Sequence, residues 1–365
     1  MKITIERKSF VDSLTIGSQM AGKSKTLPIL DNAKITLKNG NAVISSFDGE
    51  VAITNRTPII ECDEDCVFCI EPQSLITLLK SIKDEVVSLS LENNVCTIRH
   101  NNGELSLPFL NADIFPKPVL DEDASTIEIS SEKVSNWLKD AKNFVHKNAL
   151  YPALMCVCLY WENGELGVAS TDSMSLYHDN TEIDYSGDKQ VATVSSKAVD
   201  AVLAMINGNE SVVISNGSRT VMFRTSNSML VATKPEQAYP DFKRIIPTKS
   251  RIEIEASKRE LIDSVKRIMI GADKGTSLIK MDASSLNIAL ASEDIVNSKK
   301  ALENCVCTCM GGEISIGING LRLQTLLNTI EGDNVRFLID DYNRPIVIKD
   351  SAKQNKILIL MPCVI

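Results

Sequence analysis

One short apolar pattern occurs three times along this chain, and the copies are evenly spaced. Each copy contains a leucine and an isoleucine three residues apart, and successive copies lie 124 residues apart: Leu79 and Ile82, Leu203 and Ile206, Leu327 and Ile330. In the first copy, apolar residues recur with the period of a helix that buries one face, from Leu75 to Ile82. Each copy is followed by a β-rich stretch, at 85–91, 211–215 and 334–339. A helix followed by strands at a constant period predicts a tandem repeat of whole domains.

The length agrees with three such domains. A chain of 365 residues has room for three copies of a 124-residue unit, each large enough to bury its own core. We predict domains at 1–120, 121–248 and 249–365. The first boundary lies after the proline-containing stretch 111–118, and the second follows the segment Tyr239–Pro247.

Turn and strand signals indicate the content of each copy. Asn39-Gly40 and Asn163-Gly164 lie between alternating apolar runs and predict hairpins, and a third hairpin is expected around Ser284. Every copy begins with a strand and an amphipathic helix, and the repeated helix comes later. The fold class is therefore α+β, with two helices packed on antiparallel sheets in each of three tandem repeats.

Composition excludes several classes of protein. No apolar run approaches the ~20 residues that a membrane span needs, and the charged start at residues 1–8 lacks the apolar core of a signal peptide. We therefore expect a cytoplasmic protein. Its ten cysteines are then expected to be reduced thiols.

One stretch matches a phosphate-binding loop. Residues Gly17–Ser24 fit the pattern G-x-x-x-x-G-K-[ST], and Phe337–Asp341 resembles the strand that would hold magnesium. Such a loop must leave a strand and open a helix, so that backbone N–H groups face the phosphates. Here the preceding segment has helical period, and Pro28 follows too closely for a long helix. We interpret the stretch as a basic loop.

Neither the cysteines nor the histidines form a recognisable site. Cys62, Cys66 and Cys69 could begin a zinc site, but a fourth ligand at suitable spacing is missing. Other cysteines alternate with period two, as residues on one face of a strand do. The three histidines lie apart from any nucleophile motif. We therefore predict no catalytic residue, metal or cofactor.

The placement of charge is more informative. The whole chain carries −8, yet the six expected helices (7–21, 73–83, 130–147, 197–206, 256–270 and 321–330) contain 14 Lys or Arg and 6 Asp or Glu. These helices therefore carry +8 and the remainder −16. Exposed helix faces often favour lysine for solubility alone. The functional alternative is a basic helical surface that contacts the phosphate backbone without reading bases.

Several motifs together resemble the β sliding clamps of bacterial DNA polymerase III, over the whole length of the chain. They occur in the same order as in that family: Leu27–Leu30, Ala169–Asp172, Tyr239–Pro247, Ile316–Asn319 and Leu360–Pro362. The resemblance implies a non-catalytic homodimeric ring with helices around a central hole and sheets outside. It also implies loading by a clamp-loader ATPase, sliding on double-stranded DNA without sequence preference, and tethering of replicative and repair polymerases through short peptide motifs.

The resemblance also assigns residues to three surfaces. A peptide pocket is expected at Leu154, Thr171, Leu176, Pro240, Arg244, Ile245, Asn319, Arg322, Ile346, Met361 and Pro362. Cations expected to face DNA are Lys23, Lys25, Lys80, Lys139, Lys142, Lys147, Lys197, Lys266 and Arg267. A dimer interface is expected to join Leu105 and Leu107, on an edge strand, to Met269 and Ile270 of a second copy.

The pocket departs from the family pattern in two places. Ser173–Ser175 stands where Gly-His-Arg is common, and Cys363–Ile365 stands where a methionine and an arginine often occur. Both changes remove positive charge from the expected rim. Core packing remains the alternative for Leu154 and Leu176. For the whole chain, the alternatives are a repeat scaffold for protein partners and a phosphate-loop nucleotide-binding protein. The apolar tail Leu360–Ile365 is expected to pair as a strand or to lie over an apolar groove.

Overall fold

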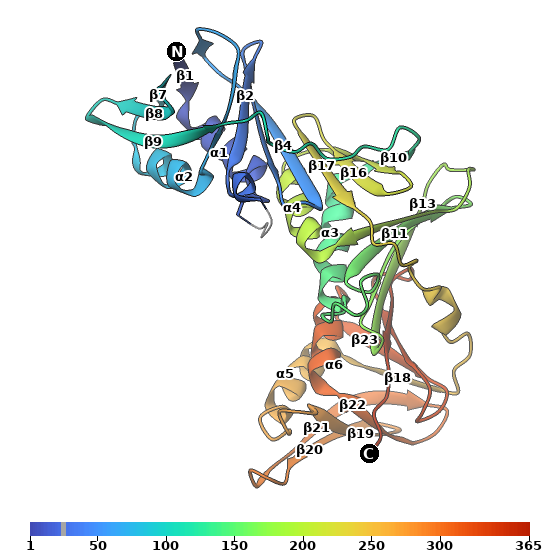
Figure 1. The fold of residues 1–365 in the computed structure, drawn as a ribbon. Coiled ribbons are helices and arrows are strands. Elements are labelled where there is room, and N and C mark those ends of the chain that lie inside the picture. Colours follow the sequence, from blue (N-terminus) through green and yellow to red (C-terminus); the bar gives the residue numbers. More distant parts are fainter. Residues whose placement is uncertain (23–26) are drawn as a thin grey trace. The chain divides into compact units, whose positions relative to one another are not determined.

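The computed structural model describes residues 1–22 and 27–365 (Figure 1). It divides into two compact units, one formed by 1–136 with 194–236 and the other by 137–193 with 237–365. The α-helices of the described residues are α1 (Arg7–Gly17), α2 (Pro72–Ser81), α3 (Ser131–Ala141), α4 (Ser196–Ile206), α5 (Lys258–Ile268) and α6 (Gly320–Asn328). Short 3₁₀ turns are η1 (Pro28–Asp31), η2 (Lys142–Phe144) and η3 (Phe242–Ile245). Among the described residues, no helix is long and apolar enough to cross a membrane.

The first unit is built on one antiparallel sheet. Its strands are β1 (Lys2–Glu6), β2 (Ala33–Lys38), β3 (Asn41–Phe47), β4 (Val51–Pro58), β5 (Glu61–Cys62), β6 (Cys66–Ile70), β7 (Val86–Glu92), β8 (Val95–His100), β9 (Gly103–Asn111), β10 (Ser125–Ser130), β15 (Ser211–Asn216), β16 (Thr220–Arg224) and β17 (Ser228–Thr233). They follow the order β10-β15-β16-β17-β4-β3-β2-β6-β9-β8-β7-β1-β5.

The second unit is built on a sheet of the same kind. Its strands are β11 (Cys156–Glu162), β12 (Glu165–Thr171), β13 (Ser175–Glu182), β14 (Gln190–Ser195), β18 (Ile252–Ser257), β19 (Leu278–Ser284), β20 (Asn287–Asp294), β21 (Lys299–Met310), β22 (Ile314–Asn319), β23 (Asn334–Ile339), β24 (Ile346–Asp350) and β25 (Ile357–Leu360). Their order is β14-β11-β12-β13-β25-β24-β23-β18-β21-β20-β19-β22.

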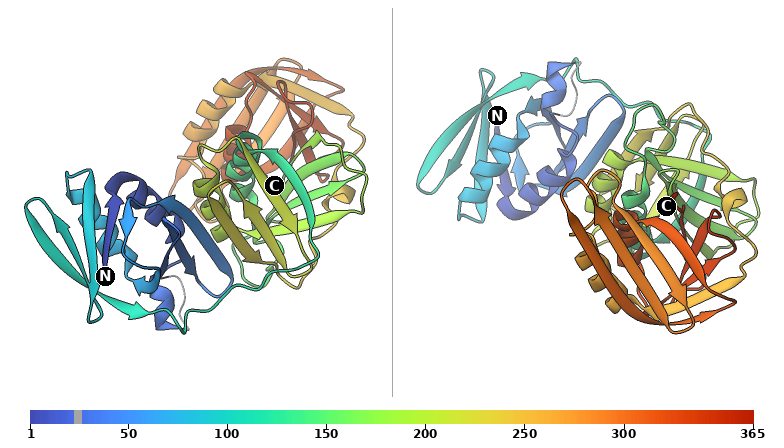
Figure 2. Two further views of the ribbon diagram at one scale, coloured as in Figure 1. Left: turned by 90° about the horizontal axis from the view of Figure 1, so that it is seen from above. Right: turned by 90° about the horizontal axis from the view of Figure 1, so that it is seen from below.

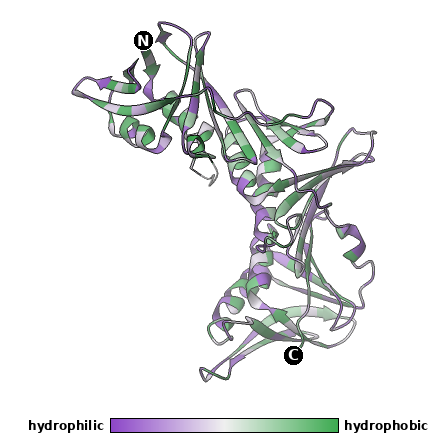
Figure 3. Ribbon diagram, viewed as in Figure 1, coloured by the Kyte–Doolittle hydropathy of each residue, from purple (hydrophilic) through white to green (hydrophobic). Residues whose placement is uncertain are grey.

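Helices cover one face of the sheet, and period-two burial fixes which side chains face them (Figure 2). In β2 and β3 every second residue is buried, and Figure 3 shows the resulting alternation of apolar and polar positions. Leu75 and Leu79 of α2 pack with Val87 and Ile98 of the sheet in the core of the first unit. The helical period read from the sequence therefore identifies the buried face correctly.

Local sequence signals predict most element boundaries. Both Asn-Gly hairpins are confirmed, with positive φ at Asn39 and Gly40 and at Asn163 and Gly164, the residues that best tolerate it. All six expected helices are present; α4 begins one residue before its expected range, and the other five are shorter than theirs. Cys305 and Cys307 of β21 are buried while their neighbours are exposed, which confirms the prediction of one strand face.

The three predicted domain ranges are not tested by this division into two units. Strands from different predicted ranges share a sheet within each unit: β4 pairs with β17, and β13 pairs with β25. The boundaries at 120 and 248 stay predictions. The expected linker is nevertheless well fixed at Asp121, whose carboxylate accepts hydrogen bonds from the backbone N–H groups of Arg219 and Thr220 at 3.0 and 2.8 Å.

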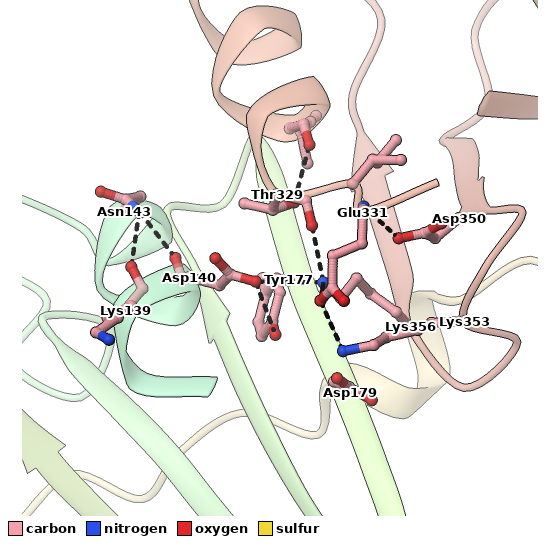
Figure 4. A network of polar contacts seen from close by, with 12 residues as sticks. Lys139, Asp140, Asn143, Tyr177, Asp179, Thr329, Glu331, Asp350, Lys353 and Lys356 are labelled. Atoms are coloured by element: carbon pink, nitrogen blue, oxygen red, sulfur yellow. Dashed lines mark hydrogen bonds and ion pairs between the residues drawn. The ribbon is translucent and has the colours of Figure 1, made fainter. Parts of the chain in front are cut away.

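A buried lysine connects elements of the second unit (Figure 4). The Lys356 side chain is almost completely buried, and its Nζ donates to the Thr329 carbonyl oxygen at 2.7 Å. The same Nζ lies 3.3 Å from carboxylate oxygens of Asp140 and Glu331. Burial raises the pKa of Asp140, with Lys356 opposing this effect. Lys356 therefore provides a positive charge and hydrogen-bond donor for a carboxylate of α3 and for a carboxylate and a carbonyl oxygen that follow α6.

Replacing Lys356 by Ala should destabilise the protein by about 2 to 3 kcal/mol, because it leaves buried acceptors without their donor. The free energy of unfolding from denaturant titration measures this effect. The control is Lys353→Ala, which breaks the exposed ion pair to Glu331 and should cost less than about 1 kcal/mol. Equal effects of the two substitutions would contradict the assigned role of Lys356.

Candidate protein-binding grooves and basic helix faces

The segment Tyr239–Pro247 is anchored on the sheet of the second unit. Phe242 of η3 is buried in a cluster with Tyr160, Leu176 and Ile359. Beside it, Lys243 places its Nζ 4.5 Å from the centre of the Tyr160 ring and 3.2 Å from a carboxylate oxygen of Glu162. These contacts fix the path of the backbone and leave the following side chains exposed.

A hollow of about 520 Å³ follows this segment, and we call it the linker groove. Its lining residues are Ser173, Arg244, Ile245, Ile246, Pro247, Thr248, Lys249, Asp340, Arg344, Pro345 and Met361. Arg244 is largely exposed and pairs with Asp241 at 2.7 Å. Lys249 and Arg344 make no ion pair with any described residue.

A second hollow of about 420 Å³, the tail groove, shares Met361 with the first. It is lined by Ser315, Ile316, Gly317, Tyr342, Asn343, Met361, Pro362, Cys363, Val364 and Ile365. The chain end forms its wall because β25 pairs with β13 and β24, and the Cys363 N–H then donates to the Gly317 carbonyl oxygen at 2.8 Å. Of the two alternatives expected for the tail, strand pairing holds for Leu360 at the end of β25 and for Cys363, which forms an isolated bridge with Gly317. Residues 361–365 line the groove, as the other alternative expected.

The structure brings together only some of the predicted pocket residues. Arg244, Ile245 and Met361 line the linker groove, and Met361 and Pro362 line the tail groove. Pro240 is exposed, and Leu154 and Asn319 are half-buried, but none of these three lines either groove. The remaining members are buried or ion-paired.

Thr171, Leu176 and Ile346 lie in the interior. Leu176 and Ile346 are each 1% exposed, so both support the site from the core and do not line it. Leu176 therefore packs in the core, which is the alternative that the sequence left open for it. The Thr171 hydroxyl donates to the Ser175 carbonyl oxygen at 2.7 Å and so shapes the β12–β13 turn.

Arg322 also differs from its expected role. Its Nε lies 2.9 Å from Asp172 Oδ2, and Asn319 caps the same helix by accepting the Arg322 N–H. Burial opposes ionisation of Asp172, but hydrogen bonds from Ser175 and Arg322 outweigh it, so the pKa of Asp172 lies below its usual range. Arg322 therefore fixes α6 to the β12–β13 turn.

Sequence reasoning missed the cationic rim of the linker groove. The departures at Ser173–Ser175 and Cys363–Ile365 predicted a loss of positive charge, yet Lys249 and Arg344 restore it. Lys249 follows the segment Tyr239–Pro247, and its nearness to Pro247 is the signal that the sequence offers. Arg344 comes from the β23–β24 connection, and no pattern in the sequence relates it to this segment.

The predicted DNA-facing cations fall into three groups. Lys80, Lys139, Lys147 and Lys266 are exposed and make no ion pair with a described residue. Lys197 is held by Asp48 at 2.9 Å and Glu50 at 2.6 Å, and Arg267 by Glu303 at 2.7 Å, so neighbouring carboxylates neutralise both charges. Lys142 is half-buried in η2, and Lys23 and Lys25 lie outside the described residues. Lys8 of α1 and Arg259 of α5 are exposed helix cations that the prediction omitted.

The predicted dimer residues lie at two open sheet edges. Leu105 is exposed and Leu107 half-buried on β9. Among the described strands, residues 103–108 pair only with β8, and residues 109–111 pair with β6. The predicted edge strand is therefore residues 103–108 of β9. Ile270 is 74% exposed just beyond α5, and Met269 is half-buried. In β21, residues 299–306 pair with β20 alone.

The structure lacks the context of a phosphate loop. Gly17 is the last residue of helix α1 and not the end of a strand, and a Cβ there would lie 2.5 Å from the Ile44 carbonyl oxygen. Lys23 and Ser24 lie outside the described residues. Within the described ranges, no group of three or more metal-ligating side chains is present.

Comparisons with known proteins agree on one family. The profile of the N-terminal domain of the DNA polymerase III beta subunit matches residues 1–121, and that of its C-terminal domain matches residues 243–364. The chain belongs to the DNA polymerase III beta subunit family. It is 23% identical to the beta sliding clamps of Bacillus subtilis strain 168 and Escherichia coli K12, and each alignment covers 99% of both chains.

Solved structures of the family confirm the fold. The DNA polymerase III beta subunit of Thermotoga maritima has a TM-score of 0.93 at 21% identity, covering 100% of this chain and 99% of its own. A DNA polymerase sliding clamp of Pseudomonas aeruginosa has a TM-score of 0.95 at 19% identity, with both chains fully covered. The predicted α+β clamp fold is thereby confirmed.

Buried His178 of the second unit is expected to make this unit sensitive to acid. Burial lowers its pKa to about 4, with Glu165 and Asp179 opposing the shift and Lys243 adding to it. Its Nε2 lies 2.7 Å from the Tyr160 hydroxyl, next to Phe242. The unfolded chain therefore binds this proton more readily than the folded chain at any pH between about 6.5 and 4.

Stability should accordingly be full above pH ~6.5 and should fall as the pH drops towards 4, by at most about 1.4 kcal/mol per pH unit from this group. Unfolding free energies measured across this range test the effect. His178→Gln keeps a hydrogen-bonding side chain and should flatten this part of the profile. A profile that is unchanged in the variant would show that another group causes the acid sensitivity.

Proposed function

We propose that this chain is a DNA sliding clamp, a non-catalytic cytoplasmic protein that encircles duplex DNA and keeps polymerases on it. The observation that carries the proposal is that the chain aligns with beta sliding clamps over almost its full length. The chain and its clamp relatives align over 99% of both, and the threefold repeat accounts for that length. A repeat scaffold for protein partners would not need unpaired cations on its helices.

The distribution of cations supports contact with DNA. The exposed lysines Lys80, Lys139 and Lys266 lie on three of the expected helices, α2, α3 and α5, and Lys147 follows the turn η2 that continues α3. Such side chains attract phosphates as point charges and carry no information about sequence. Binding would therefore be weak and sequence-blind, and retention would come from closure of the ring.

Two copies of this chain could close into a ring. The open edge at residues 103–108 of β9 and the open edge at 299–306 of β21 belong to opposite ends of the chain. Two copies joined head to tail through unlike ends form a closed two-fold ring. Exposed Leu105 and Ile270 supply apolar contacts beside these edges. A clamp-loader ATPase would open such a ring.

The two grooves support capture of short peptides from polymerases. They share Met361, whose flexible side chain can pack against different ligands. Ile245 is 48% exposed, and it lines the linker groove together with Lys249 and Arg344. A peptide with apolar anchors and an acidic residue matches this chemistry.

Electrostatic contact with DNA predicts a change in salt dependence. Neutralising the exposed helix lysines by the quadruple change Lys80→Gln, Lys139→Gln, Lys147→Gln and Lys266→Gln should weaken binding. It should also reduce the slope of log K against log [salt] by about 0.9 for each phosphate that the variant no longer neutralises. Titration of a labelled duplex at several salt concentrations measures both quantities.

The matched control changes four cations on strands: Lys2→Gln, Lys38→Gln, Arg56→Gln and Arg224→Gln. It removes the same charge and should leave the slope unchanged. Retention after loading on closed circular DNA tests the ring separately, and the double variant Leu107→Asp/Ile270→Asp should lose retention as a monomer. Equal slopes in both quadruple variants, or strong preference for one duplex sequence, would count against the clamp.

Capture of peptides should depend on Met361. Met361→Ala removes the side chain shared by both grooves and should weaken binding of a polymerase-derived peptide about 30-fold, because anchoring side chains commonly contribute ~2 kcal/mol. Arg244→Glu should weaken it less, since Arg244 is largely exposed. The control Met310→Ala changes an exposed methionine outside both grooves. Unchanged affinity in Met361→Ala would remove the groove assignment but not the clamp.

A further inference from the structure

Two strand pairs join successive repeats within the units, and we call each such pair a seam. In the first unit β4 pairs with β17, and Val51 lies opposite Ala232. In the second unit β13 pairs with β25, and Ser175 lies opposite Leu360. Val51 and Ser175 are 124 residues apart and each begins its strand. The two seams therefore have the same register.

Both seams are also closed by the same main-chain hydrogen bond. Just beyond the first seam, the Thr233 N–H donates to the Glu50 carbonyl oxygen at 2.9 Å. Just beyond the second, the Met361 N–H donates to the Met174 carbonyl oxygen at 2.9 Å. Glu50 and Met174 are again 124 residues apart. The hydrogen bond extends each seam by one step into the preceding turn.

An ion pair completes each seam at the same turn. Asp48 Oδ2 lies 2.9 Å from Lys197 Nζ at the start of α4, and Asp172 Oδ2 lies 2.9 Å from Arg322 Nε at the start of α6. In both turns the other carboxylate oxygen, Oδ1, accepts the backbone N–H three residues further on. The same aspartate therefore holds its own turn and the helix of the next repeat.

In the third repeat, the equivalent strand pairs with β20 on one edge and leaves its other edge open. Lys299, 124 residues after Ser175, begins β21, and residues 299–306 form an open edge. The first repeat offers the complementary edge at residues 103–108. In the β8–β9 hairpin Ser106 lies opposite Thr97, and in the equivalent β16–β17 hairpin Val231 lies opposite Met222. Ser106 is therefore equivalent to Val231, and the next residue, Leu107, is equivalent to Ala232. The repeat thus pairs Lys299 with Leu107 of a second copy, and Ala301 with Leu105.

We infer that the seam between two copies of this chain repeats the register of the internal seams but lacks both of their closing interactions. The position equivalent to Thr233 and Met361 is Pro108, which has no N–H to donate. The positions equivalent to Lys197 and Arg322 are Gln73 and Ser74 of α2, which carry no charge. The inference rests on the proposed ring dimer and defines how its interface differs from the joints inside each chain.

The third aspartate is already satisfied within its own turn. Asp294 Oδ1 accepts the Asn297 N–H at 3.0 Å, and its Oδ2 accepts Asn297 Nδ2 at 2.8 Å. This turn is two residues longer than the other two, and its extra residues leave Ile295 and Val296 more than 80% exposed. The intersubunit seam is therefore weakest at this turn, so the ring should begin to open there.

Restoring the missing groups should tighten the dimer. Pro108→Thr supplies the N–H, and Gln73→Lys supplies the cation opposite Asp294 of the second copy. A closed dimer contains two such seams, so each variant should lower the dimer dissociation constant about tenfold or more, and the double variant by about the product. Sedimentation equilibrium over a concentration series measures the constants.

Two controls match the chemistry of these changes. Ser81→Lys places the same charge at the far end of α2, about 12 Å along the helix. Pro118→Thr replaces a proline outside the strands. Neither should change the dissociation constant. A dimeric wild type whose affinity is unchanged or weakened by both seam variants would overturn the inference and leave the clamp proposal intact. A wild type that is monomeric at every concentration would instead overturn the ring dimer itself.

Discussion

Main-chain pairing between open sheet edges is the constraint on which the rest of this structure depends. Each repeat ends in strands whose unpaired N–H and C=O groups would invite uncontrolled association. The chain covers two such edges by pairing β4 with β17 and β13 with β25. Two further edges, at residues 103–108 and 299–306, belong to the first and third repeats. Closure by a second copy is the arrangement that leaves neither of them open.

The same sheets decide where a protein-binding surface can form. The Tyr239–Pro247 segment cannot continue a strand at its prolines, so it crosses the sheet and is pinned there by Phe242 and Lys243. The chain end then pairs as β25 and turns against Gly317, where a larger residue would meet the Cys363 carbonyl oxygen. Both grooves result from these two irregular segments lying on a rigid sheet, which is why they share Met361.

Sequence patterns predicted the features that depend on neighbouring residues. Helix periodicity, both Asn-Gly hairpins and the pairing of the tail follow from local residue types, and the structure confirms them. What the sequence could not predict depends on contacts between distant residues. The ion pairs of Lys197, a predicted DNA-facing cation, are an example, because its partners Asp48 and Glu50 come about 150 residues earlier. The sequence left Leu176 open between the pocket and the core, because its burial depends on how the strands pack.

In the proposed ring dimer, those long-range ion pairs would also explain how the joints inside each chain stay closed while the joint between copies opens. An ion pair of this kind adds little when exposed, but Asp48 is almost fully buried, and there the cation offsets a cost that burial would otherwise impose. Removing the cation alone would leave an uncompensated carboxylate and strain the turn. The third repeat avoids that penalty because Asn297 satisfies Asp294 within the turn. An aspartate satisfied by its own turn loses nothing when the next repeat departs, so this joint can separate while the two internal joints stay closed.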